Sequence, residues 1–256
     1  MKVGYSYLQH QYNPDGLLAK TILADFRLLF ESGDFTLGYP VRRLEEAIQE
    51  KFNVRHAIGV SNGTDALALA LIAMGFDHGN QWVALPVNTF IATVGAVLQV
   101  GANIRFVDVG QDYLIDKALA RKAAARCVIG VDLTGAPVRW ASDDPWLEGK
   151  RYLRDAAQAI GAEVNGVSVA NLGEAACFSL HPLKNLNVAG DGGLVTTNDD
   201  EIAGKVRLLR NHGLQDRDTV VMPGFNHRLS SLQAIVAYQQ LTWQGEHGFD
   251  WVPERR

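Results

Sequence analysis

The sequence alternates short apolar runs with segments of helical periodicity, and this alternation restricts the fold more than any other feature. Runs at 57–60, 82–86 and 104–108 have the length of buried strands, and helical patterns at 66–74 and 91–97 separate them. Strand and helix signals in this order are typical of parallel strands joined by right-handed crossovers. The sequence therefore predicts an α/β fold with a mixed, mostly parallel sheet between helices. Further strand signals stand at 127–131, 151–155, 174–180 and 194–197, and further helical patterns at 117–125, 199–211 and 230–241.

Two amphipathic helices are predicted ahead of the first strand. Apolar residues recur at helical spacing from 17 to 30, and Ser32 and Gly33 follow as a stop signal. A second helical pattern spans 41–52. We expect both helices to contribute packing rather than chemistry.

Composition excludes several classes of protein. The chain has 256 residues, 47% of them hydrophobic and 20% charged, which is enough to bury one large core. A formal net charge of −4 and a pI near 6.0 provide no basic surface for nucleic acid. Cys127 and Cys177 lie in apolar runs, away from metal-ligand spacing, and are expected to be buried and reduced. No apolar leader and no uncharged span of about 18 residues is found, so we expect a cytoplasmic protein without a membrane partner.

The segment 178–186, followed by a glycine-rich stretch at 190–193, contains the lysine on which the functional interpretation depends. Lys184 lies between two apolar runs and is predicted in a turn that joins two strands. A turn lysine followed by glycines that let a ligand approach the backbone is a candidate for Schiff-base formation with a carbonyl cofactor. The alternative is a solvated surface lysine, which the spacing alone does not exclude.

A small polar turn connects the run at 57–60 to the helix at 66–74. This order places unpaired N–H groups and the positive end of the helix dipole at the mouth of the sheet, where a phosphate binds well. Gly63 and Thr64 are therefore predicted to hold a phosphate. The alternative is a helix cap, because Ser, Asn, Thr and Asp all cap helices, and the two interpretations are compatible.

Five further motifs accompany the lysine segment, at 60–67, 88–93, 155–159, 210–213 and 226–229. In this order they resemble the DegT/DnrJ/EryC1/StrS family of sugar aminotransferases, which use pyridoxal phosphate on the fold-type-I aminotransferase scaffold. The resemblance runs from about residue 37 to about residue 241. It implies a seven-stranded sheet in a large cofactor-binding domain at 1–241, with a short tail at 242–256 in place of the family's small domain.

The resemblance implies roles around the cofactor ring for four residues. Lys184 would hold pyridoxal 5'-phosphate as a Schiff base and then move a proton as a base. Asp155 would pair with the pyridinium nitrogen, since a carboxylate with a reference pKa near 3.9 stays ionised. Phe90 would stack on the ring and Gln158 would hydrogen-bond the cofactor. Taken alone, Phe90 is equally a core residue and Asp155 a helix cap.

The resemblance also implies an anchor for the cofactor phosphate. Gly63, Thr64 and Ser179 would bind it from one chain, and Asn226 would reach it from a neighbouring subunit. A homodimer with shared active sites is therefore expected. Taken alone, Ser179 is equally a structural serine and Asn226 a turn residue.

The sequence departs from the family's pattern in three places besides its end. Asp132 and Thr134 stand where the family usually has a His and a Tyr, and the crossover at 135–149 is short. Arg154 stands where the family commonly has a Glu, and strand alternation directs it away from Asp155. His181 fits either the substrate side of the pocket or an ordinary loop.

The expected function is transfer of an amino group from glutamate or glutamine to a nucleotide-linked keto sugar, as in polysaccharide or antibiotic sugar biosynthesis. A sugar dehydratase of the same family is an alternative, although those relatives carry histidine in place of the lysine. Another is a catalytically impaired homologue that acts as a subunit or interaction module. A nicotinamide-binding protein is excluded, because no G-x-G-x-x-G follows the first strand.

Overall fold

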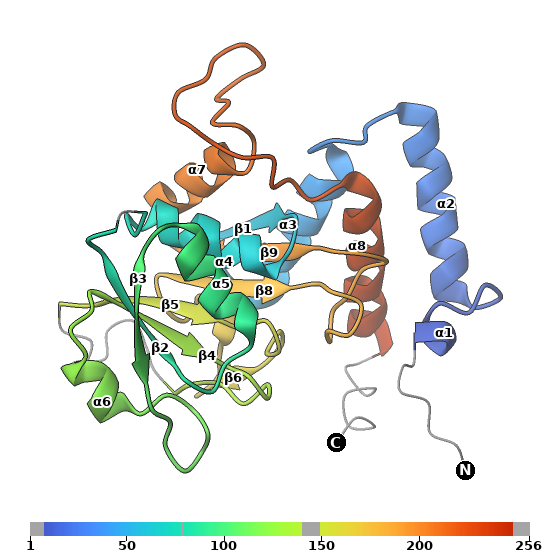
Figure 1. The fold of residues 1–256 in the computed structure, drawn as a ribbon. Helices are drawn as coiled ribbons and strands as arrows, with labels where there is room; N and C mark the ends of the chain where they lie inside the picture. Colours follow the sequence, from blue (N-terminus) through green and yellow to red (C-terminus); the bar gives the residue numbers. More distant parts are fainter. Residues whose placement is uncertain (1–7, 78, 140–148, 248–256) are drawn as a thin grey trace.

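A seven-stranded sheet organises the chain (Figure 1). The structure is a computed structural model that describes residues 8–77, 79–139 and 149–247. Strand order is β1-β9-β8-β5-β4-β2-β3; β9 is antiparallel to both its neighbours, and the other neighbouring pairs are parallel. The predicted mixed, mostly parallel sheet of seven strands is confirmed. Its strands are β1 (His56–Val60), β2 (Trp82–Pro86), β3 (Asn103–Val107), β4 (Cys127–Val131), β5 (Arg151–Asp155), β8 (Ala175–Ser179) and β9 (Gly193–Thr197).

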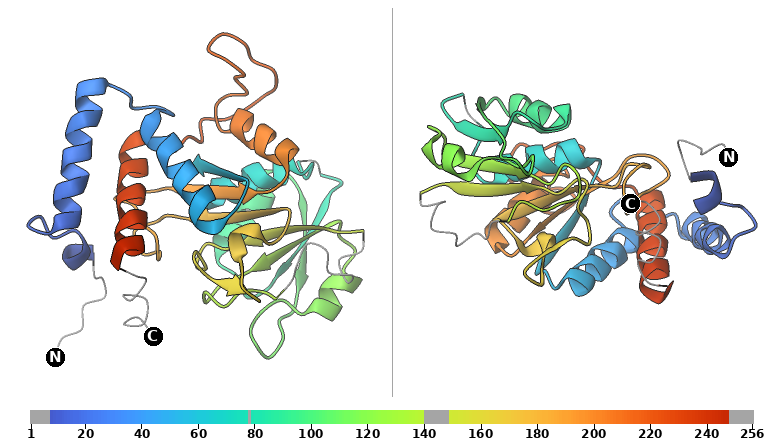
Figure 2. Two further views of the ribbon diagram at one scale, coloured as in Figure 1. Left: turned by 180° about the vertical axis from the view of Figure 1, so that it is seen from behind. Right: turned by 90° about the horizontal axis from the view of Figure 1, so that it is seen from below.

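Helices cover both faces of the sheet (Figures 1 and 2). One core lies under α4 (Gly63–Ala73), α5 (Ile91–Gln99) and α7 (Asp200–Leu209), and receives Ile58 and Val195 from the strands. The opposite core receives the alternate strand residues, such as Ala57 and Leu194, and packs against the N-terminal and C-terminal helices. Strands buried on both faces explain the continuous apolar runs in the sequence.

The second core is closed by α2 (Leu17–Ser32), α3 (Tyr39–Phe52) and α8 (Ser231–His247). Helices α2 and α8 lie side by side at one end of the sheet, and the short α1 (Leu8–Gln11) precedes α2 (Figure 2). Helix α2 ends at Gly33, whose φ of 69° lets its N–H donate to Leu29 O. Both predicted N-terminal helices are thus confirmed. No helix within the described ranges combines the length and apolar character that a bilayer crossing requires.

Several boundaries differ from those predicted. Helix α8 continues past residue 241 and carries Trp243, which packs against the second core, so the predicted boundary falls inside a helix. Helix α6 (Lys117–Lys122) is shorter than the pattern at 117–125, because Lys150 Nζ bonds Ala123 O and Ala125 O at 2.6 and 2.7 Å. A small hairpin of β6 (Glu163–Val164) and β7 (Val167–Ser168) and the 3-10 turn η2 (Val169–Asn171) were not predicted. The tail at 248–256 and most of the crossover at 135–149 lie outside the described residues.

Both cysteines are free and buried, as expected. Cys127 is in β4 and Cys177 is in β8, and both side chains belong to the first core. Burial raises the pKa of each thiol above its ordinary value, so both remain protonated. They therefore act as small apolar side chains.

The sheet topology brings distant loops to one edge. Because β9 is reversed relative to both neighbours, β1 runs parallel to β8, β5, β4 and β2. The carboxyl ends of these five strands therefore share an edge, which is where ligands bind in open α/β sheets. The loops that follow them carry the predicted lysine, aspartate and phosphate-binding residues.

Candidate active site

A cavity of about 670 Å³ lies at this edge of the sheet. Seven of the eight predicted site residues line it, although they come from four separate loops: Gly63, Thr64, Phe90, Asp155, Gln158, Ser179 and Lys184. The cavity also includes residues that were not predicted as part of the site, namely Asn62, Asp65, Leu67, Ala92, Val131, Asp132, Leu133, Ala157, His181, Leu183 and Asp191.

The N-terminus of α4 forms one wall of the cavity. Asn62 caps the helix, since its Oδ1 accepts from Asp65 N at 2.8 Å. Gly63 follows in close contact with Ser179; a Cβ placed on Gly63 would lie 2.8 Å from Ser179 Cβ. Only a glycine fits there without a shift. The capping interpretation is confirmed for Asn62. Phosphate binding stays a prediction, compatible with a first turn that borders the cavity beside the hydroxyl of Ser179.

A carboxylate beside an anion site would oppose binding unless its charge were engaged, and Asp65 occupies that position. Its Oδ2 accepts from Ser61 Oγ at 2.5 Å and from Asn62 Nδ2 at 2.7 Å. His227 Nδ1 lies 3.1 Å from the same oxygen. Three partners therefore engage this oxygen and offset its negative charge beside the helix end.

Asp155, at the end of β5, is held by α5 and by its own loop. Its Oδ2 accepts from Thr93 Oγ1 at 2.7 Å and its Oδ1 accepts from Ala157 N at 3.1 Å. Burial raises the pKa of Asp155, whereas these hydrogen bonds and the charge of Lys184 lower it. The ordinary pKa of an aspartate therefore does not describe Asp155. Its ionised form is stabilised only by the hydrogen bonds and by Lys184.

Thr93 was not predicted as a site residue. It is fully buried in α5, and its hydroxyl also bonds Thr89 Oγ1 at 2.7 Å. The sequence carries no local signal for this role, because Thr89 precedes α5 and only the fold brings Thr93 to Asp155.

Lys184 lies in the loop between β8 and β9, as predicted, and its side chain is half-buried. Burial lowers the pKa of its amine, and the charge of Asp155 opposes this shift. A lowered pKa increases the neutral, nucleophilic fraction at pH 7. The alternative of a fully solvated surface lysine does not fit this placement.

Phe90 caps the start of α5 and borders the same cavity, with 66% of its surface exposed. A core role is therefore excluded for this ring. An exposed aromatic ring at a cavity mouth offers a face for stacking a flat ligand.

Asn226 is the one predicted site residue that does not line the cavity. It is exposed and pairs with Asn211 in an isolated antiparallel bridge. The next residue joins this segment to the turn before α4, because Ser61 N donates to His227 O at 3.0 Å. Asn226 thus lies in a segment beside the cavity but does not line the cavity.

The two departures at Asp132 and Arg154 form one interaction. Arg154 Nη1 contacts both carboxylate oxygens of Asp132 at 2.8 Å, and its Nη2 donates to Val138 O at 2.7 Å. Both side chains are completely buried. Asp132 Oδ1 also accepts from Val138 N at 2.7 Å. Arg154 faces away from Asp155, as alternation predicted, and fixes the loop after β4 that borders the cavity.

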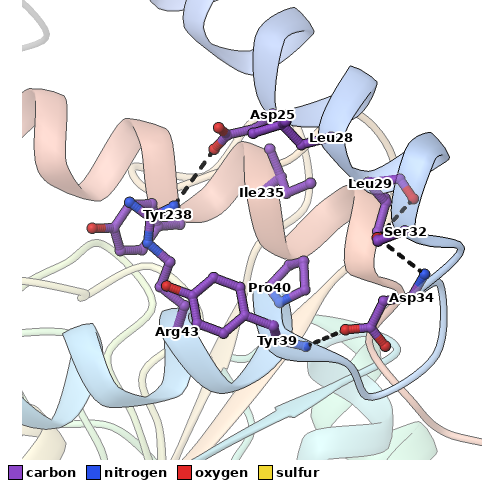
Figure 3. A pocket seen from close by; sticks show the side chains of 10 residues that line it. All are labelled: Asp25, Leu28, Leu29, Ser32, Asp34, Tyr39, Pro40, Arg43, Ile235 and Tyr238. Atoms are coloured by element: carbon purple, nitrogen blue, oxygen red, sulfur yellow. Dashed lines mark hydrogen bonds and ion pairs between the residues drawn. The ribbon is translucent and has the colours of Figure 1, made fainter.

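A smaller hollow of about 250 Å³ lies between α2, α3 and α8 (Figure 3). Its charged groups have partners: Arg43 stacks 3.9 Å from the ring centre of Tyr238 and lies 3.7 Å from Asp25, and Asp34 Oδ2 accepts from Tyr39 N at 2.6 Å. None of the predicted site residues lines this hollow. Within the described residues no cluster of side chains is suited to hold a metal ion. The chemistry of the chain is therefore concentrated in the larger cavity.

Comparison with known proteins agrees with this assembly of groups. The model of the DegT/DnrJ/EryC1/StrS aminotransferase family matches residues 17–246, and the chain belongs to this family. The chain is 39% identical over 229 residues to UDP-N-acetyl-3-dehydro-alpha-D-glucosamine 3-aminotransferase of Acidithiobacillus ferrooxidans, covering 86% of this chain and 61% of that protein. The chain thus spans less than two thirds of this relative's length.

Two solved structures show the same fold. DesV of S. venezuelae, solved in complex with a ketimine intermediate, matches with a TM-score of 0.85 and 34% identity over 95% of this chain and 66% of its own. NtdA of Bacillus subtilis, solved with the bound cofactor PMP, matches with a TM-score of 0.80 and 27% identity over 88% of this chain and 53% of its own. The fold-type-I assignment is confirmed.

The Asp132–Arg154 pair gives a prediction about stability. Asp132→Asn leaves a buried guanidinium without its counter-charge, so we expect a loss of about 3–5 kcal/mol in the free energy of unfolding. Urea denaturation measures this loss. Glu31→Gln, which breaks the exposed Arg27–Glu31 pair, is the control and should cost less than about 1 kcal/mol.

A double variant separates the pair from its surroundings. Adding Arg154→Met to Asp132→Asn removes the unpaired charge and should restore part of the lost stability. Equal losses for Asp132→Asn and Glu31→Gln would show that the buried pair contributes nothing special.

Proposed function

We propose that this chain is the cofactor-binding part of a pyridoxal-phosphate-dependent aminotransferase that moves an amino group from glutamate or glutamine to a keto sugar. A nucleotide-linked sugar is the proposed acceptor, in line with the relative that acts on a UDP sugar. The observation that carries the proposal is the meeting of a half-buried Lys184 and a buried Asp155 beside the N-terminal end of α4 in one cavity.

The residues present fit the cofactor at each of its ends. The first turn of α4, with Gly63 and Thr64, and the hydroxyl of Ser179 are suited to its phosphate. Phe90 offers a ring face, and Asp155 offers a carboxylate for the ring nitrogen. Gln158 lines the cavity between these groups and would hydrogen-bond the cofactor.

The protein side of the reaction follows from these positions. When bound, pyridoxal phosphate supplies an electron sink for a carbanion at the substrate carbon. Lys184 Nζ would hold the cofactor through its carbonyl carbon and, once released, accept and return the proton as a base. Asp155 would keep the ring nitrogen protonated while Thr93 and Ala157 N–H hold its carboxylate in place.

The substrate side of the cavity carries groups that suit a sugar. His181 borders it, with its backbone N–H turned to Ser179 Oγ at 3.3 Å, and Asp191 lies at the same cavity. These polar side chains offer hydrogen bonds to hydroxyl groups. The dehydratase alternative is disfavoured by Lys184 itself, and the interaction-module alternative by the seven predicted cofactor-binding and catalytic groups that line one cavity.

We also propose a homodimer with shared sites. Asn226 is exposed beside its own cavity without lining it, which suits a contribution to a second copy. Apolar side chains also remain exposed on α5 and just before it, among them Val87 at 53%, Ile91 at 69% and Leu98 at 62%. An apolar patch of this kind is typical of a protein interface.

Lys184→Ala should lose covalent attachment of the cofactor while the protein stays folded. The side chain is half-buried in a loop, so its removal should change the free energy of unfolding by less than about 1 kcal/mol. Borohydride reduction followed by peptide mass mapping shows which lysine holds the cofactor. Attachment to another lysine in the unaltered protein would refute the assignment.

Asp155→Asn should bind the cofactor yet fail at proton abstraction, because a neutral amide no longer keeps the ring nitrogen protonated. Single-turnover rates with glutamate or glutamine measure this loss. Wild-type rates would remove Asp155 from the proposed site.

The same variant should change the pH dependence of stability. The pKa of Asp155 is raised in the folded protein above its ordinary value of 3.8, so its stabilising contribution is present below that value and is lost as pH rises through the folded pKa. Asp155→Asn lacks this contribution. Urea denaturation should therefore find the variant more destabilised, relative to the unaltered protein, at pH 4 than at pH 7.5.

Asn226→Ala should weaken cofactor binding only in the dimer, because the side chain would serve the partner's phosphate. Equilibrium dialysis together with sedimentation measures both affinity and association. Asn211→Ala removes the neighbouring residue of the same bridge and serves as the control. A monomer that binds the cofactor as tightly as any dimer would contradict the shared site.

A further inference from the structure

The loop that carries Lys184 is attached to the rest of the molecule through a buried asparagine. Asn187 follows Lys184 by three residues and is completely buried. Its Nδ2 donates to Lys184 O at 3.0 Å. Val188 N, next along the chain, donates to Leu180 O at 2.8 Å and closes the base of the loop. The backbone of Lys184 is thus held by a side chain that lies outside the cavity lining.

Asn187 is in turn held by helix α8 and by the N-terminal segment. Gln240 of α8 is 1% exposed, and its Nε2 lies 2.8 Å from Asn187 O and 3.1 Å from Asn187 Oδ1. Tyr12, just after α1, donates its hydroxyl to Asn187 Oδ1 at 2.7 Å. Buried amides with partners of this kind restrict a segment to one conformation.

A second glutamine of α8 holds the same loop. Gln233 precedes Gln240 by seven residues, which is two helical turns, so both lie on one face of the helix. Its Nε2 donates to Ala189 O at 3.0 Å. Gly190 has a φ of +150°, and a Cβ there would lie 2.7 Å from Gln233 Nε2. A side chain at this position would have to displace the end of Gln233 and would adopt a φ that favours glycine, so Gly190 suits this contact.

We propose that Asn187 and Gln240 are positioning residues that hold the Lys184 amine in the cavity, at the place where it meets a carbonyl ligand. The identity of that ligand rests on the proposed function. An amine held in a fixed orientation captures a carbonyl far more efficiently than one on a free loop. Neither residue touches the cavity, so both act through the backbone of Lys184.

The test compares two adjacent glutamines of α8. Gln240→Met keeps the side-chain volume but removes the donor to Asn187. Gln239→Met is the matched control, because Gln239 bonds Asp25 Oδ2 at 2.7 Å on another side of the helix. Gln233 is less buried, so Gln233→Met provides a milder variant should Gln240→Met fold poorly.

Two measurements separate positioning from general structure. Hydrogen exchange on cofactor-free protein should be about tenfold faster for the amides at 184–188 in Gln240→Met, since a released loop opens more often. With pyridoxal phosphate added, the fraction trapped on Lys184 by borohydride should fall about tenfold relative to the total bound, because the phosphate site is untouched. Gln239→Met should change neither, and Gln233→Met should change both in the same direction as Gln240→Met.

Unchanged exchange at 184–188 and an unchanged trapped fraction in folded Gln240→Met and Gln233→Met would overturn the proposal. An equal fall in total and trapped cofactor would also overturn it, because that result indicates a structural role alone. If the unaltered protein binds no pyridoxal phosphate, the proposed function fails, and exchange still decides whether α8 holds the loop.

Discussion

Desolvation of two opposite charges in one cavity is the constraint on which the site depends. Burial moves the pKa of Asp155 upward and that of Lys184 downward, so each group is driven toward its neutral form, and their mutual attraction opposes both shifts. Such a balance costs stability unless hydrogen bonds support the charged forms. Thr93 and Ala157 N–H provide that support for Asp155. Burial thus moves the two pKa values toward each other, which is the direction that acid-base chemistry uses.

The single reversed strand is what allows these groups to meet. Strand β9 lies between β1 and β8 and is antiparallel to both, so the loops after β1 and β8 emerge at the same edge. Gly63, at the start of α4, and Ser179, at the end of β8, then come into direct contact, although they are far apart in the sequence. In an all-parallel sheet, a crossover helix would have to connect these strands, and the two loops would not be brought together by a strand that pairs with both neighbours.

The sequence was sufficient for those features that have a local cause. Apolar runs located the strands and stop signals such as Gly33 located helix ends. The family resemblance named eight site residues, and seven of them line one cavity at the edge where strand ends collect. Long-range partners were not accessible in this way. The hydrogen bond from Thr93 to Asp155 joins residues 62 positions apart, and no local pattern distinguishes such a threonine from an ordinary core residue. The end of α6 was missed for the same reason, because Lys150 bonds the carbonyls of Ala123 and Ala125, just after the helix, from a segment about 25 residues away.

Asp132 and Arg154 show most clearly what a position-by-position interpretation leaves out. Each is a departure from the family's pattern, and each in isolation would introduce an unpaired buried charge, which costs several kcal/mol. Joined by two contacts of 2.8 Å, they neutralise each other and fix the loop after β4. Either residue alone would be unfavourable in this surrounding, so the two departures constitute a single structural change. The cavity wall beside Asp155 therefore depends on a pair whose members the sequence places 22 residues apart.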